Sequence, residues 1–135
     1  MEVYNSKYLH IAFFAEQRLI EATWLSETKK MDTIECKQEF LNYLDVVRKQ
    51  QPSCVVVDTS NMCFTFNPAV QDWINETILT PLLSMSVNKI AFVISQDFFA
   101  QLSTKQTMDE KEGLKFVTKY FDSKEAAKQW VLSAS

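Results

Sequence analysis

The chain has 135 residues, of which 47% are hydrophobic and 23% charged, and its formal net charge is -3. This balance is typical of one globular domain spanning residues 1–135, and the acidic charge argues against a nucleic-acid partner, which needs a basic surface. The sequence holds one glycine, Gly113. It therefore excludes the glycine-rich turns of phosphate loops, dinucleotide fingerprints and nucleophile elbows.

Two strands are predicted near the N-terminus. From Leu9 to Phe14, and again from Ile20 to Trp24, apolar side chains recur at every second position, which is the period of a half-buried strand. The connection between the two segments is short, so we expect them to pair antiparallel.

A helix is predicted over residues 33–49, followed by a buried strand. Asp32 is a suitable N-cap, and Glu35 follows three positions later, as in a capping box. The expected inward stripe consists of apolar residues at helical spacing, namely Ile34, Phe40, Leu41, Leu44 and Val47. Residues 54–57 then form a continuous apolar run that is largely β-branched. Such a run favours a central strand buried on both faces.

A second helix is expected to begin at Asn67 and Pro68, because asparagine is a common N-cap and proline fits the first helical position. Apolar residues keep their helical spacing beyond Pro81. This pattern indicates a helix kinked near Pro81, with an end at Thr80 as the alternative.

The C-terminal part adds two strands and two helices. Residues 89–95 and 114–121 are expected to be strands, the second nearer the sheet edge because it carries lysines. A short helix is predicted over residues 96–107. A polar loop is expected to follow it and to turn at Gly113. Asp122 is expected to cap the last helix, with Glu125 completing a capping box. The residues of this helix expected to face inward are Ala126, Ala127, Trp130 and Val131.

The predicted order of elements is therefore β-β-α-β-α-β-α-β-α. Strands that alternate with helices form parallel pairs through crossover connections. We expect an α/β fold in which helices pack on a mixed five-stranded sheet.

Four segments also carry a resemblance to a known family: residues 55–58 (Val-Val-Val-Asp), 71–74 (Gln-Asp-Trp-Ile), 89–93 and 121–130. With the order of elements, they resemble the STAS domain, the anti-sigma-factor-antagonist type of fold, and especially small stand-alone bacterial STAS-like proteins of uncharacterised function. STAS regulators present a phosphorylatable Ser or Thr at the start of the helix after the central strand. At that helix entrance this chain has Asn67 and Pro68.

The loop after the central strand is the candidate site. Asp58 closes that strand at the edge where parallel sheets bind ligands, near a switch in strand order, although aspartate commonly shapes its own loop instead. Thr59, Ser60 and Thr65 place hydroxyls near a helix N-terminus that favours anions; the bland alternative is a loop that satisfies its own backbone.

Aromatic residues give this loop a further use. Phe64 and Phe66 either fold over the core as a lid or, with Phe98, line a groove or a dimer surface. The expected ligand or partner surface consists of eight residues from the loop and the following helix: Asp58, Ser60, Phe64, Thr65, Phe66, Asn67, Gln71 and Trp73.

Other candidate groups carry less information. The three cysteines, Cys36, Cys54 and Cys63, form no close pair, which argues against disulfides and structural zinc and favours a reducing cytoplasm. The one histidine, His10, lies far along the chain from Cys63, which it would have to activate as a nucleophile. Asp72 and Glu76 share one helix face and are better explained as exposed than as an acid–base pair.

These observations define the expected function. The sequence shows no set of nucleophile, base and orienting group, no secretory signal, and no apolar run near the roughly 20 residues of a membrane span. We expect a non-enzymatic, cytoplasmic interaction or regulatory domain that binds a protein partner or forms a homodimer, without cofactor or metal. The alternative is a module that binds a small apolar or anionic ligand, lipids included, near the 58–67 loop.

Overall fold

The computed structural model describes residues 1–62, 68–82, 85, 87–95 and 117–133. Within them one mixed sheet contains six strands: β1 (Glu2–Asn5), β2 (Leu9–Phe14), β3 (Leu19–Trp24), β4 (Cys54–Asp58), β5 (Lys89–Val93) and β6 (Val117–Phe121). Adjacent strands from β1 to β3 pair antiparallel, and those from β3 to β6 pair parallel. The α/β class, the mixed sheet and the antiparallel pairing of the first two predicted strands are thus confirmed.

The expectation of five strands is wrong, because β1 was missed. This strand has four residues, and its register against β2 shifts between Glu2 and Tyr4. So short and irregular a segment gives no readable alternation. The strands also follow one another in sequence order across the described sheet, so the switch in strand order expected beside Asp58 is not found there.

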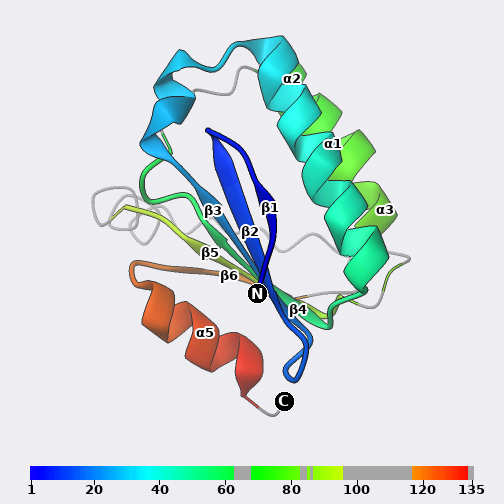
Figure 1. The fold of residues 1–135 in the computed structure, drawn as a ribbon, viewed down its shortest axis with the longest axis vertical. Coiled ribbons are helices and arrows are strands. Elements are labelled where there is room, and N and C mark those ends of the chain that lie inside the picture. Colours follow the sequence, from blue (N-terminus) through cyan, green and yellow to red (C-terminus); the bar gives the residue numbers. More distant parts are fainter. Residues whose placement is uncertain (63–67, 83–84, 86, 96–116, 134–135) are drawn as a thin grey trace.

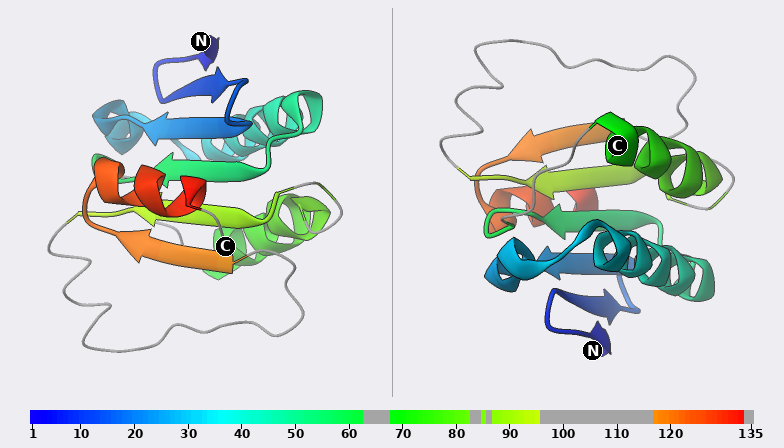
Figure 2. Two further views of the ribbon diagram at one scale, coloured as in Figure 1. Left: turned by 90° about the horizontal axis from the view of Figure 1, so that it is seen from below. Right: turned by 90° about the horizontal axis from the view of Figure 1, so that it is seen from above.

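Helices cover both faces of the sheet, as Figure 1 and Figure 2 show. A 3-10 turn, η1 (Ser26–Lys30), leads into α1 (Thr33–Gln50), which lies on the same face as α2 (Pro68–Ile74) and α3 (Thr80–Leu82). The last helix, α5 (Lys124–Leu132), lies on the opposite face and packs against β4, β5 and β6. The helices that follow β3 and β4 therefore lie on one face of the sheet, and the helix that follows β6 lies on the other.

The start of α1 confirms the predicted capping box. Asp32 Oδ1 accepts a hydrogen bond of 2.8 Å from the Glu35 N–H, and Glu35 Oε1 accepts one of 3.0 Å from the Asp32 N–H. The predicted apolar stripe is wrong at two positions, since Ile34 is 79% and Leu41 41% exposed. Phe40, Leu44 and Val47 pack against the core as predicted. They share the inward face with four residues that were not predicted there, namely Cys36, Glu39, Tyr43 and Val46, and this spacing turns Ile34 and Leu41 outward.

The second helix continues past Pro81 as predicted, through a widened turn. A π turn, η2 (Asn75–Leu79), joins α2 to α3. The Thr80 N–H donates to the Asn75 carbonyl, and the Thr80 hydroxyl donates to the same oxygen at 3.0 Å. Proline lacks an N–H and its ring crowds the preceding turn. The wider turn just before Pro81 therefore lets the helix continue.

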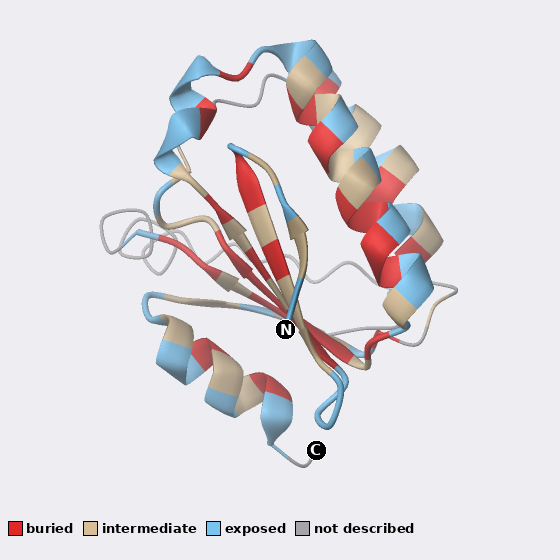
Figure 3. Ribbon diagram, in the orientation of Figure 1, coloured by how far each residue is buried: buried red, intermediate tan, exposed pale blue. Residues whose placement is uncertain are grey.

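Two hydrophobic clusters fill the two sides of the sheet. The larger lies between the sheet and α1, and the smaller lies under α5. Strand β4 serves both, because Val55 and Val57 belong to the first cluster while Cys54 and Val56 belong to the second. The predicted burial of this strand on both faces is confirmed, and Figure 3 shows its buried residues at the centre of the fold.

The cap of α5 differs from the prediction by one residue. The Ser123 hydroxyl, rather than the Asp122 carboxylate, accepts the capping hydrogen bond from the Ala126 N–H at 3.1 Å. Ala127 and Val131 are buried, whereas Ala126 is exposed, because it lies one position before the inward pair at i and i+4. The predicted helix over 96–107, the turn at Gly113 and strand residues 114–116 lie outside the described residues.

Candidate functional site

Asp58 lies at the centre of the edge where the parallel strands end. It is the last residue of β4, in register with Thr23 of β3 and Val93 of β5. Only 8% of the residue is exposed. A carboxylate so deeply placed needs compensating hydrogen bonds or a positive partner.

The loop after β4 supplies the first of these contacts. Asp58 Oδ1 accepts hydrogen bonds from the Ser60 N–H at 3.0 Å and from the Ser60 hydroxyl at 2.6 Å. The Thr59 N–H and hydroxyl both donate to the Val93 carbonyl, at 2.8 and 3.0 Å. Two of the three hydroxyls that the sequence suggested for anion binding, those of Thr59 and Ser60, are thus committed to β5 and to the loop, while Thr65 lies outside the described residues.

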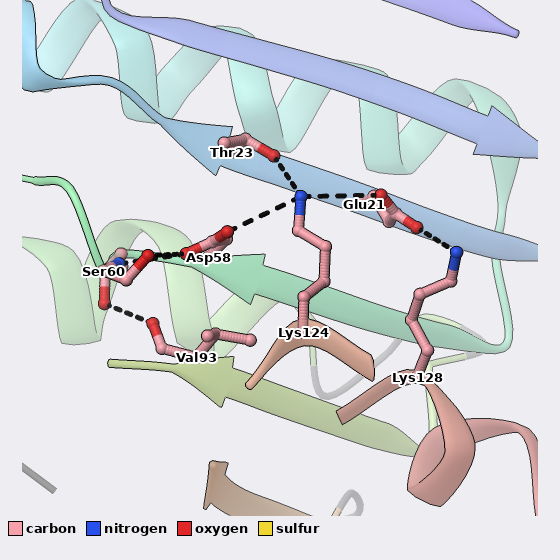
Figure 4. Close-up of polar contacts among 8 residues, drawn as sticks. Glu21, Thr23, Asp58, Ser60, Val93, Lys124 and Lys128 are labelled. Carbon is pink, nitrogen blue, oxygen red and sulfur yellow. Dashed lines mark hydrogen bonds and ion pairs between the residues drawn. The ribbon is translucent and has the colours of Figure 1, made fainter. Parts of the chain in front are cut away.

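Two lysines of α5 supply the positive partners (Figure 4). Lys124 Nζ lies 3.5 Å from Asp58 Oδ2, 3.9 Å from Glu21 Oε1 and 3.3 Å from the Thr23 hydroxyl. One helical turn later, Lys128 Nζ lies 2.7 Å from the buried Oε2 of Glu21. We call Glu21, Asp58, Lys124 and Lys128 the ion cluster.

The ion cluster joins three elements through side chains of balanced charge. Its carboxylates are 13% and 11% exposed, and each lysine side chain is 38% exposed. Lys128 Nζ also lies 5.2 Å from the centre of the Phe14 ring on β2. The geometry therefore favours the structural alternative for Asp58, in which its carboxylate orders the loop and attaches α5.

The eight predicted site residues do not all come together. Asp58 and Ser60 are in contact, but Trp73 packs against the cluster under α1, on the other side of the sheet, with Lys37 Nζ 5.3 Å from its ring. Phe64, Thr65, Phe66 and Asn67 lie outside the described residues, as do Phe98 and the side chain of Gln71. The expected aromatic lid or groove stays a prediction for that reason.

The two described cysteines are buried thiols. Burial raises the pKa of Cys36 to about 11 and also raises the pKa of Cys54. Both are therefore protonated near neutral pH and are poor nucleophiles. His10 Nδ1 lies 3.9 Å from Glu2 Oε2 at the strand edge, while its supposed partner, Cys63, lies outside the described residues.

Sequence reasoning missed two tyrosine–carboxylate pairs that join the N-terminal strands to α1. The Tyr4 hydroxyl donates to Glu39 Oε1 at 2.7 Å, and the Tyr8 hydroxyl donates to Glu35 Oε1 at 3.0 Å. Desolvation, followed by the nearby carboxylate, raises the pKa of both phenols. The two tyrosines are four residues apart, and so are the two glutamates. Nothing in the sequence, however, indicates that these tyrosines would meet these glutamates.

Among the described side chains, no group of three His, Cys, Asp or Glu residues is placed to hold a metal ion. Asp72 and Glu76 are exposed on α2 and η2.

No helix in the described ranges is long and apolar enough to cross a membrane. Comparison of the chain with protein-family models, curated proteins and solved structures found no match.

Proposed function

We propose that the chain is a non-enzymatic, STAS-like interaction domain that acts in the cytoplasm through protein–protein contacts, as a homodimer or with another protein. The observation that carries the proposal is the pairing at the end of β4. Asp58 is held by Ser60 and Lys124, and Thr59 is held by Val93. A catalytic group needs a free face toward substrate and a base or nucleophile within reach, and these contacts occupy the carboxylate and two of the hydroxyls of the candidate ligand-binding loop.

The order of elements adds support for the STAS-like part of the proposal. Strands β3, β4 and β5 alternate with α1 and α2, and β6 is followed by a final helix. These elements are part of the order from which the resemblance was drawn; β1 is an addition to that order, and the helix expected between β5 and β6 lies outside the described residues. The loop after β4 and the start of α2 would present the partner surface, as fold analogy suggests.

The proposal is tested by affinity capture of the tagged chain from its own host, with quantitative mass spectrometry. We expect at least one protein to be captured by the wild type and lost with Thr65→Glu and Gln71→Glu. Gln129→Glu is the matched control, because Gln129 is exposed on α5, which lies on the opposite face of the sheet from α2 (Figure 1). Retention of every partner by both surface variants, or capture of none by the wild type, would contradict the proposal.

The homodimer part has its own test. Light scattering coupled to size exclusion should give twice the mass of one chain at micromolar concentration. A mass of one chain at every concentration would remove the dimer and leave a protein partner as the proposed contact.

A further inference from the structure

Helix α5 is attached to the fold in a different way from α1. Of the described helices, α5 alone covers its face of the sheet (Figure 1). It follows β6 after Asp122 and Ser123. Of its nine residues, two are buried, Ala127 and Val131. By contrast, α1 is eighteen residues long and buries a continuous apolar stripe against the sheet. Apolar burial therefore holds α5 less strongly than α1.

Beyond these two residues, the partly buried Trp130 packs against the same cluster and against the Phe121 ring, and charged contacts add attachment at both ends of α5. Lys124 and Lys128 join its first turns to Glu21 and Asp58. At the other end, Lys89 Nζ of β5 donates to the carbonyls of Trp130 and Ser133, at 3.2 and 3.0 Å. Ammonium groups that are partly exposed are readily rehydrated, and salt screens their attraction to carboxylates.

We propose that α5 is a strap that opens as a unit while the sheet and α1 stay folded, and that the ion cluster sets how often it opens. Regions with few buried apolar contacts open at a lower free energy than the whole domain. Opening uncovers an apolar stripe of β4 and β5, which consists of Cys54, Val56, Ala91 and Val93. The inference holds whether or not the proposed interaction function is correct.

The chain carries its own probe of this motion. Cys54 lies in the cluster under α5 and is 3% exposed, whereas Cys36 lies in the cluster under α1 and is fully buried. Alkylation requires a solvent-exposed thiolate. Labelling of Cys54 therefore reports opening of α5, and labelling of Cys36 in the same molecule reports opening of the other face or of the whole domain.

The experiment is pulsed alkylation of the native chain with N-ethylmaleimide, followed by peptide mass spectrometry. Cleavage before Asp58 separates Cys54 from Cys63. We expect Cys54 to be labelled at least about tenfold faster than Cys36. Lys124→Gln should raise the Cys54 rate by a further factor of about ten, because it leaves the Asp58 carboxylate without its ammonium partner and leaves Glu21 with Lys128 alone. Lys49→Gln is the control, since it removes an exposed pair with Asp45 on α1 and should change neither rate.

Ionic strength gives a second reading that needs no variant. In the wild type, raising salt from about 0.1 M to about 1 M shortens the screening length threefold and should raise the Cys54 rate alone. Equal rates at the two thiols, including no labelling at either, would overturn the proposal. Rates that rise together with salt or with Lys124→Gln would do the same, because they would report unfolding of the whole domain.

Discussion

Asp58 and Lys124 are far apart in the sequence, yet their charged groups lie 3.5 Å apart where β4 ends and α5 begins. The carboxylate is 11% exposed and also receives both hydrogen bonds from Ser60. It is therefore a junction between the loop after β4 and the helix on the α5 face.

Asp58→Asn keeps the shape of this side chain and removes its charge. We expect a loss of about 1–3 kcal/mol in the free energy of unfolding, because Lys124 loses a partly buried partner. Denaturant unfolding followed by circular dichroism measures the change. An increase in stability would contradict this structural role and would indicate that Asp58 is kept for catalysis or ligand binding, since groups kept for those purposes are commonly destabilising.

Among the described residues other than glycine, two have a positive φ, and they give a prediction about substitution by glycine. Arg18 has φ 50° and Gln51, the C-cap of α1, has φ 48°. The Arg18 guanidinium donates to the Gln51 carbonyl at 2.6 Å, so the side chain of one secures the backbone of the other. Gln51→Gly keeps that carbonyl and removes the steric cost of the left-handed conformation. We expect a gain of about 0.5–1 kcal/mol in thermal or denaturant unfolding.

A matched glycine substitution separates conformation from composition. Arg48→Gly lies one turn earlier, within α1, and should destabilise the chain by about 1 kcal/mol. A gain at position 48, or a loss at position 51, would show that the left-handed C-cap is assigned wrongly.

The capping of α5 by Ser123 predicts that substitutions at two neighbouring residues will differ in their effect on stability. Ser123→Ala removes the acceptor for the Ala126 N–H and should cost about 1 kcal/mol. Asp122→Ala should change stability by less than about 0.5 kcal/mol. Thermal unfolding of the two variants decides between the residues, and a larger loss at Asp122 would restore the capping box expected from the sequence.

Buried thiol and phenol groups predict lower stability in alkaline solution. Burial raises the pKa of Cys36 from 9.0 to about 11, so between these pH values the unfolded chain releases a proton that the folded chain retains. The folded state then binds more protons, and its stability falls as pH rises, by up to about 1.4 kcal/mol per pH unit for each such group. The raised pKa values of Tyr4, Tyr8 and Tyr43 extend the decline above pH 10.

Unfolding curves at several values between pH 8 and pH 11 test the alkaline decline. In Cys36→Ala, the decline should be shallower than in the wild type, because only the raised pKa of Cys54 then contributes among the described thiols. A stability that is constant over this range in the wild type would show that the thiol ionises in the folded state as readily as in the unfolded chain.

Local chemistry explains which parts of the fold were predictable. The capping box of Asp32 and Glu35, the doubly buried β4 and the helix start at Pro68 each depend on neighbours in the sequence, and each is found in the structure. The orientation of α1 depends instead on which apolar residues meet the sheet. The sequence pattern therefore did not exclude Ile34 and Leu41 from the inward face.

The candidate site was predictable only in part for a similar reason. The contact between Asp58 and Ser60 follows from the turn chemistry of adjacent residues. The contacts of Glu21 and Asp58 with Lys124 and Lys128 require α5 to cross to the opposite face of the sheet. Helical periodicity in the sequence shows which side of a helix is apolar. It does not show which face of the sheet the helix covers, so the position of α5 could not be predicted from it.

A double-mutant cycle between Asp58→Asn and Lys124→Gln tests the central claim that the carboxylate at the end of β4 serves to attach α5. The free energy of unfolding is measured for the wild type, both single variants and the double variant. The account predicts a coupling of about 1–2 kcal/mol, because either substitution alone removes most of the shared interaction. A coupling within about 0.3 kcal/mol of zero would contradict it, since the two losses would then be independent.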